Sequence, residues 1–371
     1  MSKPIPIVDS HIHLFPASHL PTLAWHGPQN PLGAQHSVDE YRQATTAATT
    51  STPSAAGAAG AAPSYLRGFI FLETDRISSV EEESEKLGWS HPLDEVSLLT
   101  RIITGTPVPG EGHAEADRQL CLGMVPWAPV PGGAAVLERY MGLVRERTGE
   151  DVYRKVCGVR YLVQDKPKGV MGQAGFVEGL RWLGRQGLAF DLGVDARQGG
   201  MWQLREAAEM LRGVFDDRVE EGSRVKVVIN HLCKPNLRLP YHGPASVATH
   251  PEFLEWSSLI MAMAQYPSTF MKLSGGFSEL LPLEEGSEPD VKALVDRMQP
   301  WTDVVFDVFG PQRVMFGSDW PVCNVGGGGN AVSWGRWRRV VDEILDRRGL
   351  SQAEREGVWG GVAVQAYGVE V

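Results

Sequence analysis

Short apolar runs, many of them rich in β-branched residues, recur along the chain between more polar segments. There are eight, at residues 5–9, 66–72, 120–125, 156–161, 188–192, 225–230, 269–273 and 313–317. Several are almost continuously apolar, which is typical of parallel strands that are buried on both faces of a sheet. We therefore expect eight buried parallel strands.

The segments between these runs show the spacing of amphipathic helices. In residues 175–186, Phe176, Leu180 and Leu183 share one helical face, and residues 202–211 and 337–345 follow the same pattern. Strand and helix alternate eight times, which predicts an α/β fold, and eight is the strand number of a closed TIM or (β/α)₈ barrel. We expect a distorted barrel of this kind, with an open doubly wound sheet as the alternative.

Three stretches interrupt this alternation. Residues 44–63 consist almost entirely of Ala, Thr, Ser, Gly and Pro, so we expect a low-complexity surface loop inserted between the first two strands. We also expect a loop at residues 104–116 and a flexible segment at residues 326–329, after the last strand. No repeat or linker divides the chain, so we expect residues 1–371 to form a single barrel domain.

The formal net charge of −10 argues against nucleic acid or an anionic membrane as the main partner, since either calls for a basic patch. Four widely spaced cysteines do not form a disulfide framework, which favours a reducing compartment. No signal-peptide pattern and no transmembrane run is apparent. We expect a cytoplasmic protein with a small-molecule substrate, and the oligomeric state stays open, a homo-oligomer included.

Residues suited to chemistry follow three of the predicted strands. His11 and His13 end the first strand, and alternation places both on one face. His231 follows the sixth strand and Asp319 follows the eighth. Catalytic residues of barrel enzymes lie at these carboxyl ends of strands.

Each of these residues also has an ordinary structural interpretation. A His-x-His pair often occurs by chance, a lone His at a strand end can bond to the backbone, and Asp commonly caps a turn. Their coincidence at the same end of three strands, two of which adjoin when the barrel closes, favours an active site.

Four motifs together resemble the lactonase branch of the amidohydrolase superfamily. They are Val-Asp-Ser-His-Ile-His at 8–13, Asn-His-Leu-Cys-Lys-Pro at 230–235, Lys-Leu-Ser-Gly at 272–275 and Gly-Ser-Asp-Trp-Pro at 317–321. The resemblance extends from residue 5 to about residue 367 and makes residues 44–63 an insertion. Val362 departs from the family pattern, which tends to place Asn or Thr there, and we interpret it as a packing difference.

The resemblance implies roles for individual residues. His11, His13 and His231 would surround a lactone carbonyl oxygen, and Asp319 would take a proton from the attacking water. The substrate-binding candidates are Arg160, Tyr161, Gln164, Asp191, Trp25, Trp320 and Lys234. Weaker candidates are Gln198, Trp127, Trp334 and Ser274.

A metal is optional in this interpretation. Binuclear members of the superfamily supply His residues from strands five and six and a Lys or Glu from strand four, whereas this chain offers Asp191 and Arg160 near strands five and four. A two-metal site is therefore not expected. We expect either no required cofactor or one divalent ion, zinc first, bound by His11, His13 and Asp319 with or without His231.

The resulting hypothesis is an enzyme that hydrolyses a sugar lactone to the open hydroxy acid. A pyrone dicarboxylate would need several Arg residues, and only Arg160 can be placed near the substrate. One alternative is a metal-dependent decarboxylase of an aromatic or unsaturated acid, and another is a non-catalytic barrel that binds a sugar acid. A serine hydrolase is not expected, since the chain lacks Gly-x-Ser-x-Gly.

Overall fold

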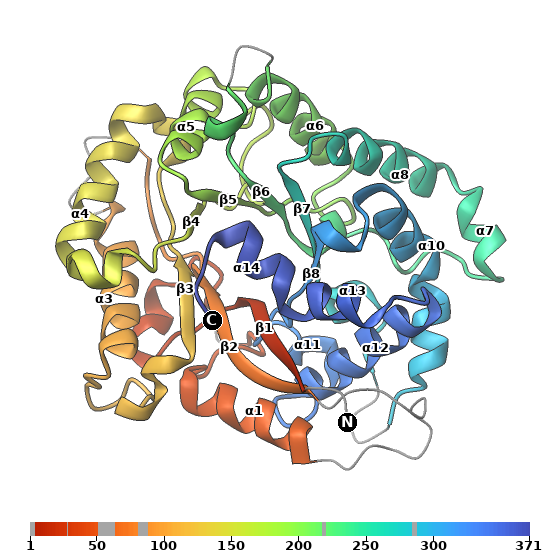
Figure 1. Cartoon of the computed structure of the whole chain (residues 1–371), viewed down its shortest axis with the longest axis horizontal. Helices are drawn as coiled ribbons and strands as arrows, with labels where there is room; N and C mark the ends of the chain where they lie inside the picture. The colour runs from red at the N-terminus through yellow and green to blue at the C-terminus, as the bar shows by residue number, and fades with distance from the viewer. Residues whose placement is uncertain (1–3, 28, 51–63, 81–87, 217–219, 284–287) are drawn as a thin grey trace.

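Eight parallel strands form the centre of the computed structural model, which describes residues 4–27, 29–50, 64–80, 88–216, 220–283 and 288–371 (Figure 1). The strands are β1 (Ile5–Ile12), β2 (Ser64–Leu72), β3 (Cys121–Val125), β4 (Gly158–Arg160), β5 (Ala189–Leu192), β6 (Val227–Ile229), β7 (Thr269–Leu273) and β8 (Val314–Phe316). Each overlaps one of the eight predicted runs, so the strand prediction is confirmed.

The barrel closes in a distorted way. Hydrogen bonds join the strands into one sheet of order β1-β2-β3 and a second of order β4-β5-β6-β7-β8. Isolated parallel bridges link the sheets, Met124 with Val156 on one side and Ile12 with Trp320 on the other. On that second side the backbone N–H of His13 also donates to the Trp320 carbonyl at 2.8 Å. These joints complete the ring that the sequence predicts, whereas an open sheet would leave two free edges.

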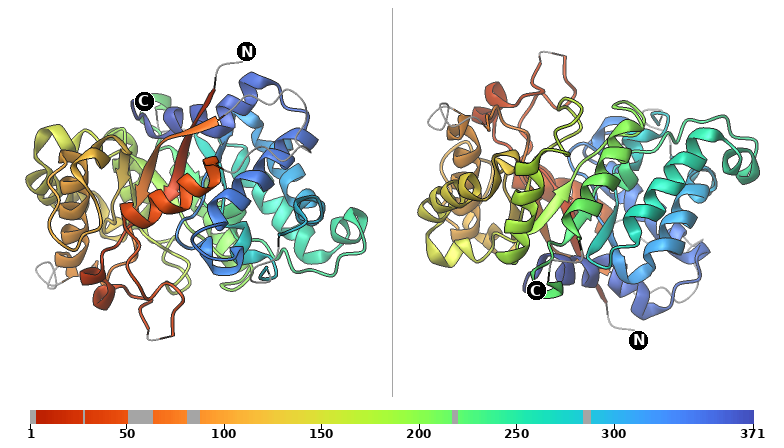
Figure 2. Two further views of the ribbon diagram at one scale, coloured as in Figure 1. Left: turned by 90° about the horizontal axis from the view of Figure 1, so that it is seen from below. Right: turned by 90° about the horizontal axis from the view of Figure 1, so that it is seen from above.

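Helices surround the strands, as the side views show (Figure 2). They are α1 (Val38–Thr50), α3 (Ser90–Thr104), α4 (Gly133–Tyr153), α5 (Ala174–Arg185), α6 (Trp202–Val214), α7 (Pro244–Ala248), α8 (Pro251–Ala264), α9 (Gly276–Glu279), α10 (Val291–Phe309), α11 (Asn324–Gly327), α12 (Ser333–Arg347), α13 (Gln352–Glu356) and α14 (Val362–Tyr367). The apolar stripes predicted for α5, α6 and α12 are buried. Within the described ranges, no helix combines the length and apolar character needed to cross a membrane.

Two of the three predicted loops need correction. Residues 44–50 continue α1, because Ala is a strong helix former and Ala44 is buried against the core. Residues 51–63 lie outside the described residues. Residues 324–327 form the short, kinked α11, and the Arg336 guanidinium donates to the Gly327 carbonyl at 2.9 Å. Residues 105–114 contain no helix or strand, which confirms most of the loop predicted there.

The last helix covers the amino-terminal ends of the strands (Figure 1). Val362 and Ala363 pack in one buried apolar cluster with Val8, Ile70 and Met315 from the barrel interior. Val362, which departs from the family pattern, therefore takes part in a hydrophobic contact. This agrees with our interpretation of the departure as a packing difference.

At the end of α14 the Tyr367 hydroxyl donates to the buried Asp191 carboxylate of β5 at 2.6 Å. Tyr367→Phe keeps the ring and removes this bond to a charged group, which contributes about 1.5–3 kcal/mol. Urea unfolding should show a stability loss of that order. Tyr65→Phe, at an exposed site on β2, should change stability by less than about 0.5 kcal/mol, and equal effects of the two substitutions would contradict this account.

Candidate active site

The two histidines at the end of β1 meet on one face, as strand alternation predicts. The Nε2 atoms of His11 and His13 lie 3.2 Å apart. His13 Nδ1 faces the carbonyl oxygens of Leu72 and Glu73, each at 3.0 Å. Since both carbonyls only accept, Nδ1 of His13 carries the proton, and its Nε2 presents a lone pair.

His231 follows β6 in a left-handed backbone conformation, with φ of 55°. Its Nδ1 lies 2.7 Å from the Ser274 hydroxyl at the end of β7. The neighbouring Gly275 also has positive φ, and a Cβ there would stand 2.7 Å from the imidazole. Gly275 is thus required both by its conformation and by the close approach of the ring.

Asp319 follows β8, also with positive φ (60°), and its N–H donates to the His11 carbonyl at 2.9 Å. The buried Asp9 of β1 anchors this segment, because its carboxylate accepts from the Ser318 N–H at 2.7 Å. The same carboxylate accepts from Tyr41 at 2.9 Å and from Trp334 at 2.8 Å.

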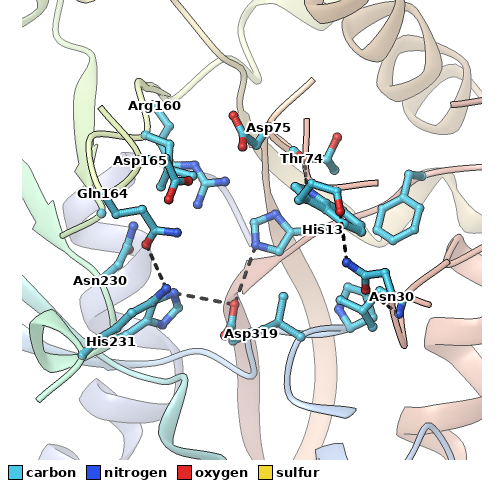
Figure 3. Close-up of a pocket in the computed structure, with 18 residues that line it drawn as sticks. His13, Asn30, Thr74, Asp75, Arg160, Gln164, Asp165, Asn230, His231 and Asp319 are labelled. Carbon is cyan, nitrogen blue, oxygen red and sulfur yellow. Dashed lines mark hydrogen bonds and ion pairs between the residues drawn. The ribbon is translucent and has the colours of Figure 1, made fainter. Parts of the chain in front are cut away.

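Three imidazoles converge on one carboxylate oxygen, and Figure 3 shows two of them, those of His13 and His231, beside Asp319. Asp319 Oδ1 lies 3.5 Å from Nε2 of His11, 3.7 Å from that of His13 and 3.6 Å from that of His231. The residues proposed from strands one, six and eight are therefore brought together.

The cluster places the neutral imidazoles of His11 and His231 beside a charged carboxylate. Burial, assisted by the charge of Lys272, holds the pKa of His11 well below its ordinary value, and burial lowers the pKa of His231 to about 3. Burial alone would raise the pKa of Asp319, but His231 and His13 outweigh it, and the pKa lies below its ordinary value. At neutral pH Asp319 is an ionised acceptor.

A buried ion pair lies beneath the histidines. Lys272 Nζ of β7 lies 2.6 Å from Asp191 Oδ1 and 3.2 Å from His11 Nδ1, and the side chains of Lys272 and Asp191 are fully buried. Burial lowers the pKa of Lys272 to about 8, so the ammonium persists at neutral pH. It donates to His11 Nδ1, which places the His11 proton on Nε2, directed toward His13 and Asp319.

The donor set also fits a single divalent cation. One ligand atom each from His11, His13 and Asp319 lies within 4.8 Å of the others. Their separations of 3.2 to 3.7 Å are close to the roughly 3.3 Å between ligands of a tetrahedral zinc ion. Ligation by His11 would require its Nε2 proton to leave, whereas the hydrogen bonds around it are complete without a metal.

A cavity of about 340 Å³ opens above the cluster. Its polar lining residues are His13, Asn30, Thr74, Asp75, Arg160, Gln164, Asp165, Asn230, His231, Lys234 and Asp319. Its other lining residues are Phe15, Trp25, Leu32, Leu162, Gly193, Pro321 and Val322. A cavity of this size holds a small, partly polar molecule.

Four of the predicted substrate-binding residues line this cavity: Trp25, Arg160, Gln164 and Lys234. Arg160 is less available than expected. Its Nε lies 2.6 Å from Glu73 Oε1 and its Nη2 donates to the Glu73 carbonyl at 2.7 Å, so its charge is neutralised by a buried partner.

Three predicted substrate-binding residues do not line the cavity. Tyr161 alternates with Arg160 and packs outward against Phe176 of α5. Asp191 is held below the histidines by Lys272 and Tyr367.

Trp320 is fully buried and donates to Asn330 Oδ1 at 2.7 Å. Of the weaker candidates, Trp127 and Trp334 are buried in packing contacts, Gln198 is exposed away from the cavity, and Ser274 supports His231.

The sequence analysis did not single out several residues that line or support the site. Thr74 and Asp75 lie two and three residues after β2, close to a strand end as His13 and Asp319 are, so this signal was available. Lys272 interrupts the apolar run of β7, which is unusual for a buried strand. Asn30 comes from a loop after β1, where no periodic pattern could reveal it.

Cys233 and Cys323, each close to a site residue in sequence, are buried free thiols. Burial raises the pKa of each thiol, which keeps both protonated. Both lie in the apolar core, as small apolar residues would.

A family model for amidohydrolases matches residues 108–369. The chain belongs to the amidohydrolase family. It is 32% identical over 365 residues to an L-rhamnono-gamma-lactonase from Scheffersomyces stipitis, with 98% of each chain covered. It is 29% identical over 227 residues to an L-fucono-1,5-lactonase from Burkholderia multivorans, which covers 60% of this chain and 66% of the relative.

The barrel of this amidohydrolase is also found in solved structures. A Burkholderia multivorans amidohydrolase solved with bound zinc superposes with a TM-score of 0.65 at 24% identity, covering 98% of this chain and 99% of the other. The family resemblance of the four motifs and the barrel prediction are both confirmed.

Lys272→Met tests the ion pair, because it leaves the Asp191 carboxylate buried without its counter-charge. We expect a stability loss of about 3–5 kcal/mol in urea unfolding. Adding Asp191→Leu should recover much of that loss, since the unpaired charge is then gone. Lys168→Met, at an exposed site, is the matched control. A double variant less stable than Lys272→Met alone would contradict this account.

Proposed function

We propose that this protein hydrolyses a sugar-derived lactone to the open hydroxy acid. The observation that carries the proposal is the convergence of three imidazoles on the ionised Asp319 at the floor of a polar cavity. The lactonase relatives support it, in particular the one aligned along 98% of the chain.

Asp319 is proposed to take a proton from a water molecule as that water attacks the lactone carbonyl. The attack forms a C–O bond and places negative charge on the carbonyl oxygen. The ring C–O bond then breaks, and Asp319 returns the proton to the leaving alkoxide. The product acid ionises at neutral pH, so each turnover releases one proton to the solution.

The histidines have different parts in this proposal. His231 lines the cavity and, with Ser274 donating to its Nδ1, directs an Nε2–H toward the developing oxyanion. Lys272 sets the tautomer of His11, and His11 in turn donates to His13 or Asp319. His11 and His13 thereby hold Asp319 charged and oriented.

One divalent ion is proposed as an optional cofactor, and zinc is the first ion to test. It would be held by His11, His13 and Asp319, with or without His231. The spacing of these donor atoms supports it, and so does the zinc in the Burkholderia structure. When bound, such an ion polarises the carbonyl as a Lewis acid.

The lactone is proposed to be a neutral polyhydroxy compound, and L-rhamnono-γ-lactone is the first to test because of the 32% identical relative. A dicarboxylate substrate is disfavoured, because Glu73 neutralises Arg160. A single domain spanning residues 1–371, a cytoplasmic location and the oligomeric state stay predictions.

Asp319→Asn should fold normally and lose roughly 10²–10⁴-fold in kcat/KM, since Asn cannot accept the water proton. Proton release from a panel of aldonolactones measures this, and thermal melting checks the fold. Asp151→Asn, at an exposed site on α4, is the control. Retained activity in Asp319→Asn would refute the assignment of Asp319 as the base.

If the wild type acidifies no lactone solution, with or without metal, the proposed lactonase function is refuted. Decarboxylase assays would then be the next step.

Chelator treatment should leave measurable lactonase activity, because His231 can donate to the carbonyl oxygen and the ionised Asp319 can accept the water proton without a metal. Adding zinc or manganese back to the same samples gives the size of any metal effect. Complete loss on chelation, with full recovery on stoichiometric zinc, would make the metal a requirement.

A further inference from the structure

Asp75 shares an uncommon backbone feature with the proposed catalytic residues. Within the described ranges six non-glycine residues have positive φ, and four of them line the cavity: Asp75, His231, Lys234 and Asp319. Left-handed conformations are unfavourable for most residues and concentrate at functional sites. This backbone turns Asp75 into the cavity at the end of β2.

The Asp75 carboxylate has no partner of its own. Among the described residues no hydrogen bond or ion pair reaches either of its oxygens, although its backbone N–H bonds to Glu73. Figure 3 shows it on the cavity wall beside Thr74, across from Asp165. A half-buried carboxylate of this kind accepts hydrogen bonds from a ligand.

A second unpartnered group lines the same cavity. Asn230 is 1% exposed, and neither Oδ1 nor Nδ2 of its side chain has a hydrogen-bond partner. A buried amide without partners is costly unless a ligand supplies them. Its carbonyl accepts and its NH₂ donates, which matches a hydroxyl group, since a hydroxyl does both.

The charge on the cavity wall limits what binds there. Burial raises the pKa of Asp75 to about 6, with Glu73 adding to the effect, so the group remains mostly ionised at neutral pH. Glu73 neutralises Arg160, and Lys234 is bonded to Gln164 at 2.8 Å and lies 3.9 Å from Asp195. The charge of Lys166 also acts on Asp75, but Lys166 does not line the cavity. Among the described residues that line the cavity, Arg160 and Lys234 are the cations, and both already have acidic partners, so a ligand carboxylate beside Asp75 would meet repulsion that they do not offset.

We propose that Asp75 and Asn230 bind hydroxyl groups of the lactone, and that Asp75 confines the site to uncharged, hydroxylated lactones. This inference rests on the proposed lactonase function and adds an explanation of which lactones the enzyme selects. It makes Asp75 and Asn230 specificity-determining residues, separate from the water-activating group.

The test compares wild type, Asp75→Asn and Asn230→Leu on three substrates. Asn adopts positive φ readily, so Asp75→Asn removes the charge and keeps the backbone. The substrates are L-rhamnono-γ-lactone, unsubstituted γ-butyrolactone and a γ-lactone bearing a carboxylate. Asp151→Asn serves as the control for a charge change outside the cavity, and thermal melting verifies folding.

Both cavity variants should lose at least about tenfold in kcat/KM on the hydroxylated lactone, because a site built for hydroxyl groups loses its partner. On γ-butyrolactone they should stay within about threefold of the wild type. Asp75→Asn alone should gain about tenfold on the carboxylated lactone, since the like charge is removed.

Equal losses on all three substrates would overturn the inference, because that pattern denotes a general structural or catalytic role. Unchanged selectivity would overturn it as well. Either outcome leaves the lactonase proposal standing as long as the wild type opens lactones. Failure of the wild type on every lactone would instead refute the function itself.

Discussion

The buried ion pair between Lys272 and Asp191 organises the interior of this barrel. It connects the Tyr367 hydroxyl of the last helix, on one side, to His11 Nδ1, on the other. Two fully buried charges are costly unless each is paired and hydrogen-bonded, and here both conditions are met. Since Lys272 only donates, His11 is restricted to one tautomer, and the proton on its Nε2 is directed toward His13 and Asp319. The chemistry at the open end of the barrel thus depends on a charge pair in its middle.

The rest of the site is held by backbone conformations that few residues adopt readily. His231 and Asp319 both have positive φ, and Gly275 provides the space that the His231 ring needs. Asp9 accepts three hydrogen bonds and ties the segment after β8 to β1. These contacts hold a carboxylate and three imidazoles at fixed separations before any substrate binds, which is the preorganisation that the proposed general acid–base catalysis requires.

Much of this architecture follows from local sequence patterns. All eight strands could be located, because a strand buried on both faces leaves a short apolar run, and the His and Asp residues at strand ends stood out against those runs. Tyr161 and Asp191 were predicted to bind substrate but do not line the cavity, for a related reason. A position near a strand end does not reveal whether the side chain points into the cavity, outward as Tyr161 does, or below the site as Asp191 does.

Individual side-chain pairings between distant segments, other than the cluster at the ends of strands one, six and eight, could not be predicted. Glu73 and Arg160 are 87 residues apart, and their ion pair changes what Arg160 can do for a substrate. Asn30 and Asn230 enter the cavity from a loop and a strand end that only the closed barrel brings together. Such contacts depend on the register and tilt of the strands, which hydrophobic periodicity does not encode.

In the proposed mechanism Asp319 activates water and does not itself attack the lactone. A single turnover with enzyme in excess over L-rhamnono-γ-lactone in ¹⁸O-labelled water tests it most directly, with mass spectrometry of both the product and the peptide that contains Asp319. If Asp319 activates water, one ¹⁸O appears in the carboxylate of the product and none in the protein. Label in Asp319, with an unlabelled product, would show that this carboxylate is the nucleophile and would contradict the account.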